Sequence, residues 1–89
     1  MTRKMPKNID LKIVEVKMIA DYKVLVTFEH GEKRTLDLVN YIKTLPNSKE
    51  ILNDKDALKH FKFSYHAVFW LGGDFIIPEM EFWYEGTPA

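Results

Sequence analysis

Three histidines offer the most direct route to chemistry, because an imidazole can ligate a metal or transfer a proton near neutral pH. His60 and His66 stand six residues apart, and His30 lies in a predicted turn. None of them has the i, i+4 helical spacing or the nearby carboxylate of a recognised metal-ligand pattern. We therefore predict no metal site, and we interpret His30 and His60 as exposed polar residues and His66 as a residue on a strand face.

Acidic side chains provide two further candidate sites. Asp54 and Asp56, together with Glu50, are loosely spaced like calcium ligands, but the glycine and the terminal glutamate of an EF-hand loop are missing. Asp37 and Asp74 lie at predicted strand–turn junctions, where a carboxylate with a shifted pKa could act as an acid or a base. Turns and helix caps use the same residue type at the same places, so we interpret these aspartates as structural.

Nucleophiles and phosphate-binding loops are also missing from the sequence. Ser48 and Ser64 lack the Gly-x-Ser-x-Gly elbow of a hydrolase, and Gly72-Gly73 lacks the remainder of a phosphate-binding loop. The chain contains no cysteine, which excludes thiolate catalysis, disulfides and cysteine-ligated zinc. We predict that the protein is not an enzyme and that it needs no cofactor.

Length and charge narrow the class of protein. A chain of 89 residues is expected to form a single domain over residues 1–89. Thirteen Lys and Arg balance thirteen Asp and Glu, which argues against nucleic acid as the main partner. No apolar run approaches the ~18 residues of a membrane helix, and no hydrophobic segment follows the charged N-terminus. We expect a cytoplasmic protein that does not enter a membrane.

The first half of the chain has the pattern of β-strands. Over residues 12–37, apolar and polar side chains alternate with a period of two in three successive segments. Asp21 separates the first two segments, and His30-Gly31 provides a turn between the second and the third. This pattern predicts a three-stranded antiparallel meander.

The middle of the chain has helical spacing in three short segments, at residues 38–43, 47–52 and 55–61, the first of them capped by Asp37. Period two returns over residues 64–77 on either side of Gly72-Gly73, which predicts a hairpin. The predicted fold class is therefore α+β: a three-stranded antiparallel meander, a short helical middle segment, and a C-terminal two-stranded hairpin.

Both ends of the chain carry features outside this pattern. Residues 1–11 are predicted to be a flexible basic arm, and residues 85–89 a frayed tail. Just before that tail stand three consecutive aromatic residues, Phe82, Trp83 and Tyr84. Three neighbours cannot all face one core, so we predict that this cluster is an interaction surface. The alternative is that Trp83 and Tyr84 only seal the sheet edge of their own chain.

Several short motifs resemble the DUF2442 family, a group of small prokaryotic domains of unknown function. The resemblance covers roughly residues 13–84, and the residues that carry it are Asp21-Tyr22-Lys23-Val24-Leu25-Val26-Thr27-Phe28, Gly31-Glu32, Asp37-Leu38, Phe61, Phe69-Trp70-Leu71-Gly72-Gly73-Asp74 and Pro78-Glu79. Members of that family are often encoded beside a DUF4160 protein, in pairs that look like toxin–antitoxin modules. The resemblance implies no set of catalytic residues.

Together these observations predict a small non-catalytic protein-interaction module, with a protein partner or a second copy as its target. The resemblance adds that it could be the antitoxin-like member of a two-gene pair. An excess of positive charge at residues 1–12 and of negative charge at residues 63–89 would steer it toward a complementary protein. The alternative is a small-ligand binder or an enzyme with a pocket between sheet and helices, which would need convergent polar groups.

Overall fold

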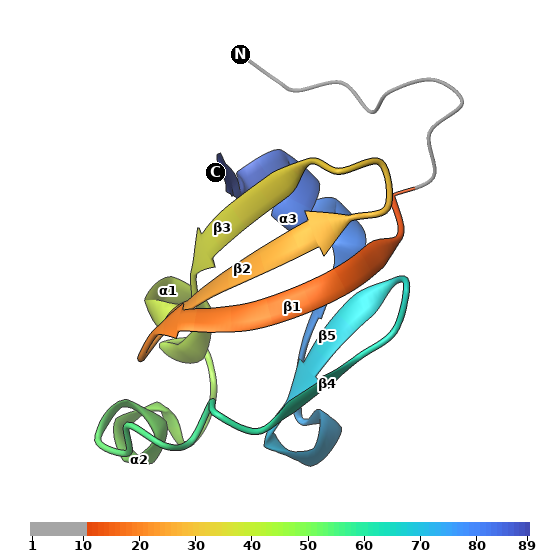
Figure 1. Ribbon diagram of the computed structural model, residues 1–89. Coiled ribbons are helices and arrows are strands. Elements are labelled where there is room, and N and C mark those ends of the chain that lie inside the picture. The colour runs from red at the N-terminus through yellow and green to blue at the C-terminus, as the bar shows by residue number, and fades with distance from the viewer. Residues whose placement is uncertain (1–10) are drawn as a thin grey trace.

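The computed structural model describes residues 11–89, in which two small antiparallel sheets share one hydrophobic core (Figure 1). The first sheet has the strand order β1-β2-β3-β7, with β1 at Ile13–Ala20, β2 at Lys23–Phe28, β3 at Lys33–Asp37 and β7 at Thr87–Pro88. The second has the order β4-β5-β6, with β4 at Phe61–Phe63, β5 at Ala67–Trp70 and β6 at Phe75–Pro78. The helices are α1 (Val39–Ile42), α2 (Ser48–Leu52) and α3 (Glu79–Glu85), and a 3-10 turn, η1 (Leu71–Gly73), joins β5 to β6.

The predicted α+β fold is confirmed, with its meander of three strands, its short helices and its further hairpin. The period of two places Val24, Val26 and Phe28 of β2 on one face, and all three are fully buried. Val68 and Ile77 of the second sheet are buried in the same core. The core is therefore formed between the two sheets, and each sheet keeps its other face toward solvent.

One predicted helix is absent, and a strand begins at its end. Residues 54–60 form turns, and Phe61 belongs to β4, so the C-terminal hairpin is part of a three-stranded sheet. The segment is too short to hold a helix by itself, whereas as a strand it pairs with β5 through the backbone groups of Lys62 and Ser64. Phe61 lies directly opposite Trp70 and is partly buried against the core.

The ends of the described chain are more ordered than predicted. Leu11, assigned to the basic arm, is buried in the core, while residues 1–10 of that arm lie outside the described residues. At the other end, the tail predicted to fray contains β7, which pairs with β3 at Arg34 and Thr35. The tail thus forms an edge of the first sheet.

Two tyrosine hydroxyls fasten the short helices to the rest of the fold. Tyr22, just before β2, donates a hydrogen bond to the carbonyl oxygen of Leu52 in α2 at 2.7 Å. Tyr41 in α1 donates to the carboxylate of Glu81 in α3, also at 2.7 Å. Burial and the neighbouring carboxylate raise the pKa of Tyr41, which keeps its hydroxyl protonated as the donor. These contacts supply the tertiary support that helices of four and five residues need.

The tail can reach β3 because residue 86 is a glycine. A Cβ atom there would overlap the carbonyl oxygen of Phe82 and would lie 3.1 Å from both the Cβ of Arg34 and the carbonyl oxygen of Thr35. Two of these three neighbours are backbone atoms, which cannot rotate away. The φ of Gly86 is −74°, an ordinary value, so the requirement is for space.

Gly86→Ala is therefore expected to lower the free energy of unfolding by about 1–3 kcal/mol, the usual cost of overpacking. Thermal unfolding followed by circular dichroism measures the change. Thr87→Ala, at the exposed neighbouring position, is the matched control and should leave the melting temperature nearly unchanged. Equal stability of Gly86→Ala and the unchanged protein would mean that the tail does not approach β3 this closely.

Candidate functional site

The aromatic cluster predicted to be an interaction surface lies mostly inside the protein. Phe82 is fully buried and Trp83 is 5% exposed, whereas Tyr84 is half-buried. In α3 these consecutive positions point in different directions around the helix, and the fold covers two of the three directions. Phe82 and Trp83 therefore cannot present a surface to a partner, and the prediction is wrong for these two residues.

Trp83 is the centre of a buried cluster that joins α3 to the first sheet. Its ring packs edge-on against Phe28 at 5.8 Å between centroids, and the guanidinium carbon of Arg34 lies 4.3 Å from its centroid. Arg34 is only 3% exposed, so its charge needs partners. Its Nη1 donates to the Glu32 carboxylate at 2.7 Å and to the carbonyl oxygen of Lys33 at 3.1 Å. These partners make the cluster a structural one.

Trp83→Ala is expected to cost about 3–5 kcal/mol of folding free energy, because it leaves a cavity beside a buried cation. Chemical denaturation monitored through the amide circular dichroism signal measures it. Tyr84→Ala removes a neighbouring, half-buried ring and should cost clearly less. If the Trp83→Ala protein kept its stability, Trp83 would not be a buried residue, and it would again be a candidate for the interaction surface.

Glu32 gives this cluster a pH dependence. The hydrogen bond from Arg34 holds the pKa of the Glu32 carboxyl below its usual value, with smaller help from His30. Because the pKa of Glu32 is lower in the folded protein, the unfolded chain binds the proton more tightly. The stability that Glu32 contributes is therefore fully present above its unfolded-state pKa, and it is lost as the pH falls through its folded-state pKa.

Glu32→Gln should therefore be less stable than the unchanged protein at pH 7, because the buried guanidinium loses its charged acceptor; the Glu32 side chain is 38% exposed and solvent screens the pair, so the expected difference is about 0.5–1 kcal/mol. The difference should shrink as the pH is lowered from about 5 to about 2, where the native carboxylate is also neutralised. Melting temperatures of the two proteins across this range provide the measurement. A constant difference would mean that Glu32 acts through packing alone.

The three histidines lie in separate places. The ring of His30 stacks on Phe28, and its Nε2 is 3.6 Å from the Glu32 carboxylate. The exposed His66 has Nδ1 3.7 Å from the carboxylate of Glu79, and His60 is exposed at the end of the turns that precede β4. Across residues 11–89, no three His, Cys, Asp or Glu side chains come together in a group that could hold a metal ion.

The aspartates predicted to be structural accept hydrogen bonds at chain turns. Asp37 accepts from the backbone N–H of Val39 at 2.9 Å, at the start of α1. Asp54 accepts from the backbone N–H of Asp56 at 2.9 Å, in the turns that replace the third predicted helix. Asp74 is exposed where η1 ends. Among the serines, Ser64 accepts from the backbone N–H of His66 at 3.2 Å.

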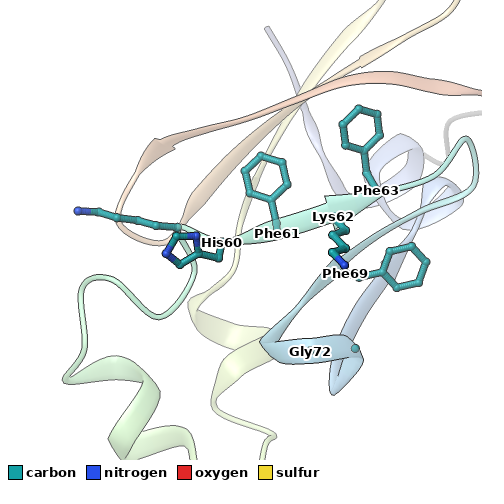
Figure 2. Close-up of a pocket in the computed structure, with 8 residues that line it drawn as sticks. His60, Phe61, Lys62, Phe63, Phe69 and Gly72 are labelled. Carbon is teal, nitrogen blue, oxygen red and sulfur yellow. The ribbon is translucent and has the colours of Figure 1, made fainter.

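A broad hollow lies beside β4, on the second sheet (Figure 2). It has a volume of about 790 Å³, and the residues that line it are Lys59, His60, Phe61, Lys62, Phe63, Phe69, Gly72 and Gly73. Figure 2 shows Phe61 and Phe63 on one side of β4 and Lys62 with Phe69 on the other, as the pairing of Lys62 with Phe69 requires. Phe63 is 43% exposed, a large apolar side chain left uncovered.

The backbone of β4 is open along its outer edge. Ser64 donates to the carbonyl oxygen of Ala67 at 2.9 Å, which makes these two residues a hydrogen-bonded pair. Alternation in an antiparallel ladder then directs the N–H and C=O groups of Phe61 and Phe63 away from β5. No strand within residues 11–89 pairs with this edge.

The charge beside the open edge is positive. Lys62 is exposed in β4, and Lys59 lies at the rim of the hollow with His60. The carboxylate of Asp56, 2.7 Å from the Lys59 ammonium, raises the pKa of that lysine and keeps it charged at neutral pH. Lys59 is thus a cation in this hollow and cannot serve as a base.

Sequence reasoning missed this site because Phe61 was grouped with a helix. The signal was present: Phe61, Lys62 and Phe63 alternate apolar, polar and apolar, as a strand does. Three residues are too few for the alternation to outweigh the helical spacing of Ala57, Leu58 and Phe61.

Comparisons with family models, curated proteins and solved structures found no match to this chain. No helix within residues 11–89 is long and apolar enough to cross a membrane.

Proposed function

We propose that this protein is a small non-catalytic interaction module whose protein partner adds an extended, acidic segment to the open edge of β4. The observation that carries the proposal is the coincidence of that edge with an uncovered, cationic hollow. In such binding, main-chain hydrogen bonds supply affinity, and side-chain pockets alongside the edge supply specificity. The free groups of Phe61 and Phe63 would make the main-chain contacts.

The side chains near the edge favour an acidic and partly apolar partner. Lys62 and Lys59 supply positive charge, which increases the association rate with a negatively charged segment. Phe63 and Phe69 supply apolar area, and aromatic side chains often anchor protein interfaces. Acidic residues alternating with apolar ones along a strand would match both features.

Catalysis has less support at this place. The groups with shifted pKa values are Glu32, Tyr41, Asp56 and Lys59; burial and a hydrogen bond to Glu81 explain the shift of Tyr41, and structural hydrogen bonds and ion pairs explain the other three. An active site usually combines shifted pKa values with convergent polar groups in an enclosed pocket. The hollow is open and is lined by cations and phenyl rings, which also weakens the alternative of a small-ligand pocket.

The resemblance to DUF2442 supports one specific partner, the protein encoded by the adjacent gene. In this proposal the chain is the antitoxin-like member of the pair and acts in the cytoplasm, where both proteins are made. Binding through β4 would leave the first sheet free.

The test is co-expression with the adjacent gene's product, followed by measurement of affinity by isothermal titration calorimetry. Lys62→Glu and Phe63→Ser should each weaken binding by about tenfold or more, because one reverses a contact charge and the other removes an anchor. Lys33→Glu makes the same charge change at an exposed position of the first sheet and should bind normally. Equal loss in Lys33→Glu and Lys62→Glu would indicate general electrostatics, and full binding by both β4 variants would reject this edge as the site.

A further inference from the structure

Among the other edge strands of residues 11–89, β1 at the start of the first sheet is the longest. Within residues 11–89, β1 pairs with β2 on one side and with no strand on the other. It has eight residues, and two large apolar side chains on it are uncovered, Val14 at 43% and Ile19 at 46% exposure. Long exposed edges of this kind are templates for pairing with another chain.

The hydrogen-bond pattern shows which backbone groups of β1 are available. Leu38 donates to the carbonyl oxygen of Tyr22, and Phe28 donates to that of Glu32, so the even-numbered residues of β2 bond to β3. Its odd-numbered residues then bond to β1, where their partners are Glu15 and Lys17. The N–H and C=O groups of Val16 and Met18 therefore point to the open edge.

The side chains of β1 are complementary to a second, antiparallel copy of β1. If a two-fold axis passes beside Val16, the two Val16 residues face each other as a hydrogen-bonded pair, and Glu15 lies opposite Lys17 of the other copy. The symmetry gives a second Glu15–Lys17 pair on the other side of the axis. Both side chains are exposed, on the solvent face of the sheet. Opposite charges directly across a strand pair stabilise it, and like charges destabilise it.

The apolar residues fit the same register. It places the exposed Val14 opposite Met18 of the other copy, and both are apolar. β1 departs from regular pairing with β2 between Ile13 and Glu15 and between Met18 and Ala20, so the regular part of this edge is Glu15–Met18. Beyond Val14, the backbone N–H of Ile13 already donates to the carbonyl oxygen of Tyr65 at 2.8 Å, which closes that end of the edge. The pairing is thus limited to Val14–Met18 of each copy, which fixes the register.

We propose that two copies of this chain associate through β1, antiparallel about Val16, with reciprocal Glu15–Lys17 contacts. The two meanders would then form one continuous sheet across a two-fold axis. The β1 edge adjoins the hollow beside β4, because Val14 and Phe63 line a common cavity, but the dimer uses the backbone of β1 and a second copy of the chain, so the inference does not depend on the proposed function. A five-residue contact predicts a weak dimer that forms at high protein concentration.

Charge exchange tests the register directly. The full chain should change from monomer to dimer in sedimentation velocity between about 10 μM and about 1 mM, the range expected for a small interface. Glu15→Lys and Lys17→Glu each place like charges opposite one another in both contacts, and each alone should weaken the dimer by about tenfold or more. An equimolar mixture of the two variants restores two opposite-charge contacts and should dimerise as the unchanged chain does.

Three further variants test whether the dimer forms through the edge of β1. Val16→Pro removes an N–H that points away from β2, so it should abolish the dimer. Val16 also packs against the core, so the matched variant is Val16→Ala, which loses the same packing, keeps the N–H and should keep the dimer. Lys33→Glu, the same charge change on β3, should leave the dimer intact. A chain that stays monomeric over the whole range would overturn the proposal. So would a dimer that survives both single charge changes, or a mixture that associates no better than the separate variants.

Discussion

The burial of Arg34 beneath Trp83 is the interaction on which the arrangement of the two sheets depends. α3 connects β6 of the second sheet to β7 of the first, and Trp83 is the residue by which it contacts Arg34 of β3. A buried guanidinium is costly unless it is paired, and Glu32, the Lys33 carbonyl oxygen and the Trp83 ring together offset that cost. The Nε of Arg34 finds no acceptor among the described residues. Removal of one more partner of Arg34 would therefore be destabilising.

Because two of the three aromatic residues of α3 are buried, the surfaces that remain for a partner include the edges of the sheets. With Phe82 and Trp83 inside, the apolar side chains that α3 offers to a partner are Met80, which is 43% exposed, and the half-buried Tyr84. The meander and the second sheet remain separate sheets, joined near one end by the Ile13–Tyr65 hydrogen bond, and β1 and β4 each keep an open edge (Figure 1). Unpaired backbone and uncovered apolar side chains therefore occur together at these two strands.

The sequence predicted those parts of the fold in which local pattern and tertiary packing agree. The meander followed from period two in β1, β2 and β3. β4 was missed because its alternation is three residues long. The burial of Trp83 could not be predicted, because it depends on Arg34, which is 49 positions earlier in the chain. The period of two places Arg34 on the face of Leu36 and Leu38, but no local pattern indicates that Trp83 covers it. The pairing of the tail with β3 could not be predicted for a similar reason. It requires the narrow space that Gly86 occupies between α3 and β3, which exists only in the folded protein.

The charges on the two open edges explain why they suit different partners. An antiparallel pair of β4 strands about Lys62 would place two ammonium groups directly opposite each other, which destabilises the pairing. A strand of three residues gives few hydrogen bonds to overcome that repulsion. β1 has both signs of charge, one on each side of Val16, so its own copy is the complement that it fits. Self-association through β4 is therefore disfavoured where self-association through β1 is favoured, and the acidic partner proposed for β4 needs the backbone groups of Phe61 and Phe63, which a dimer built on β1 does not use.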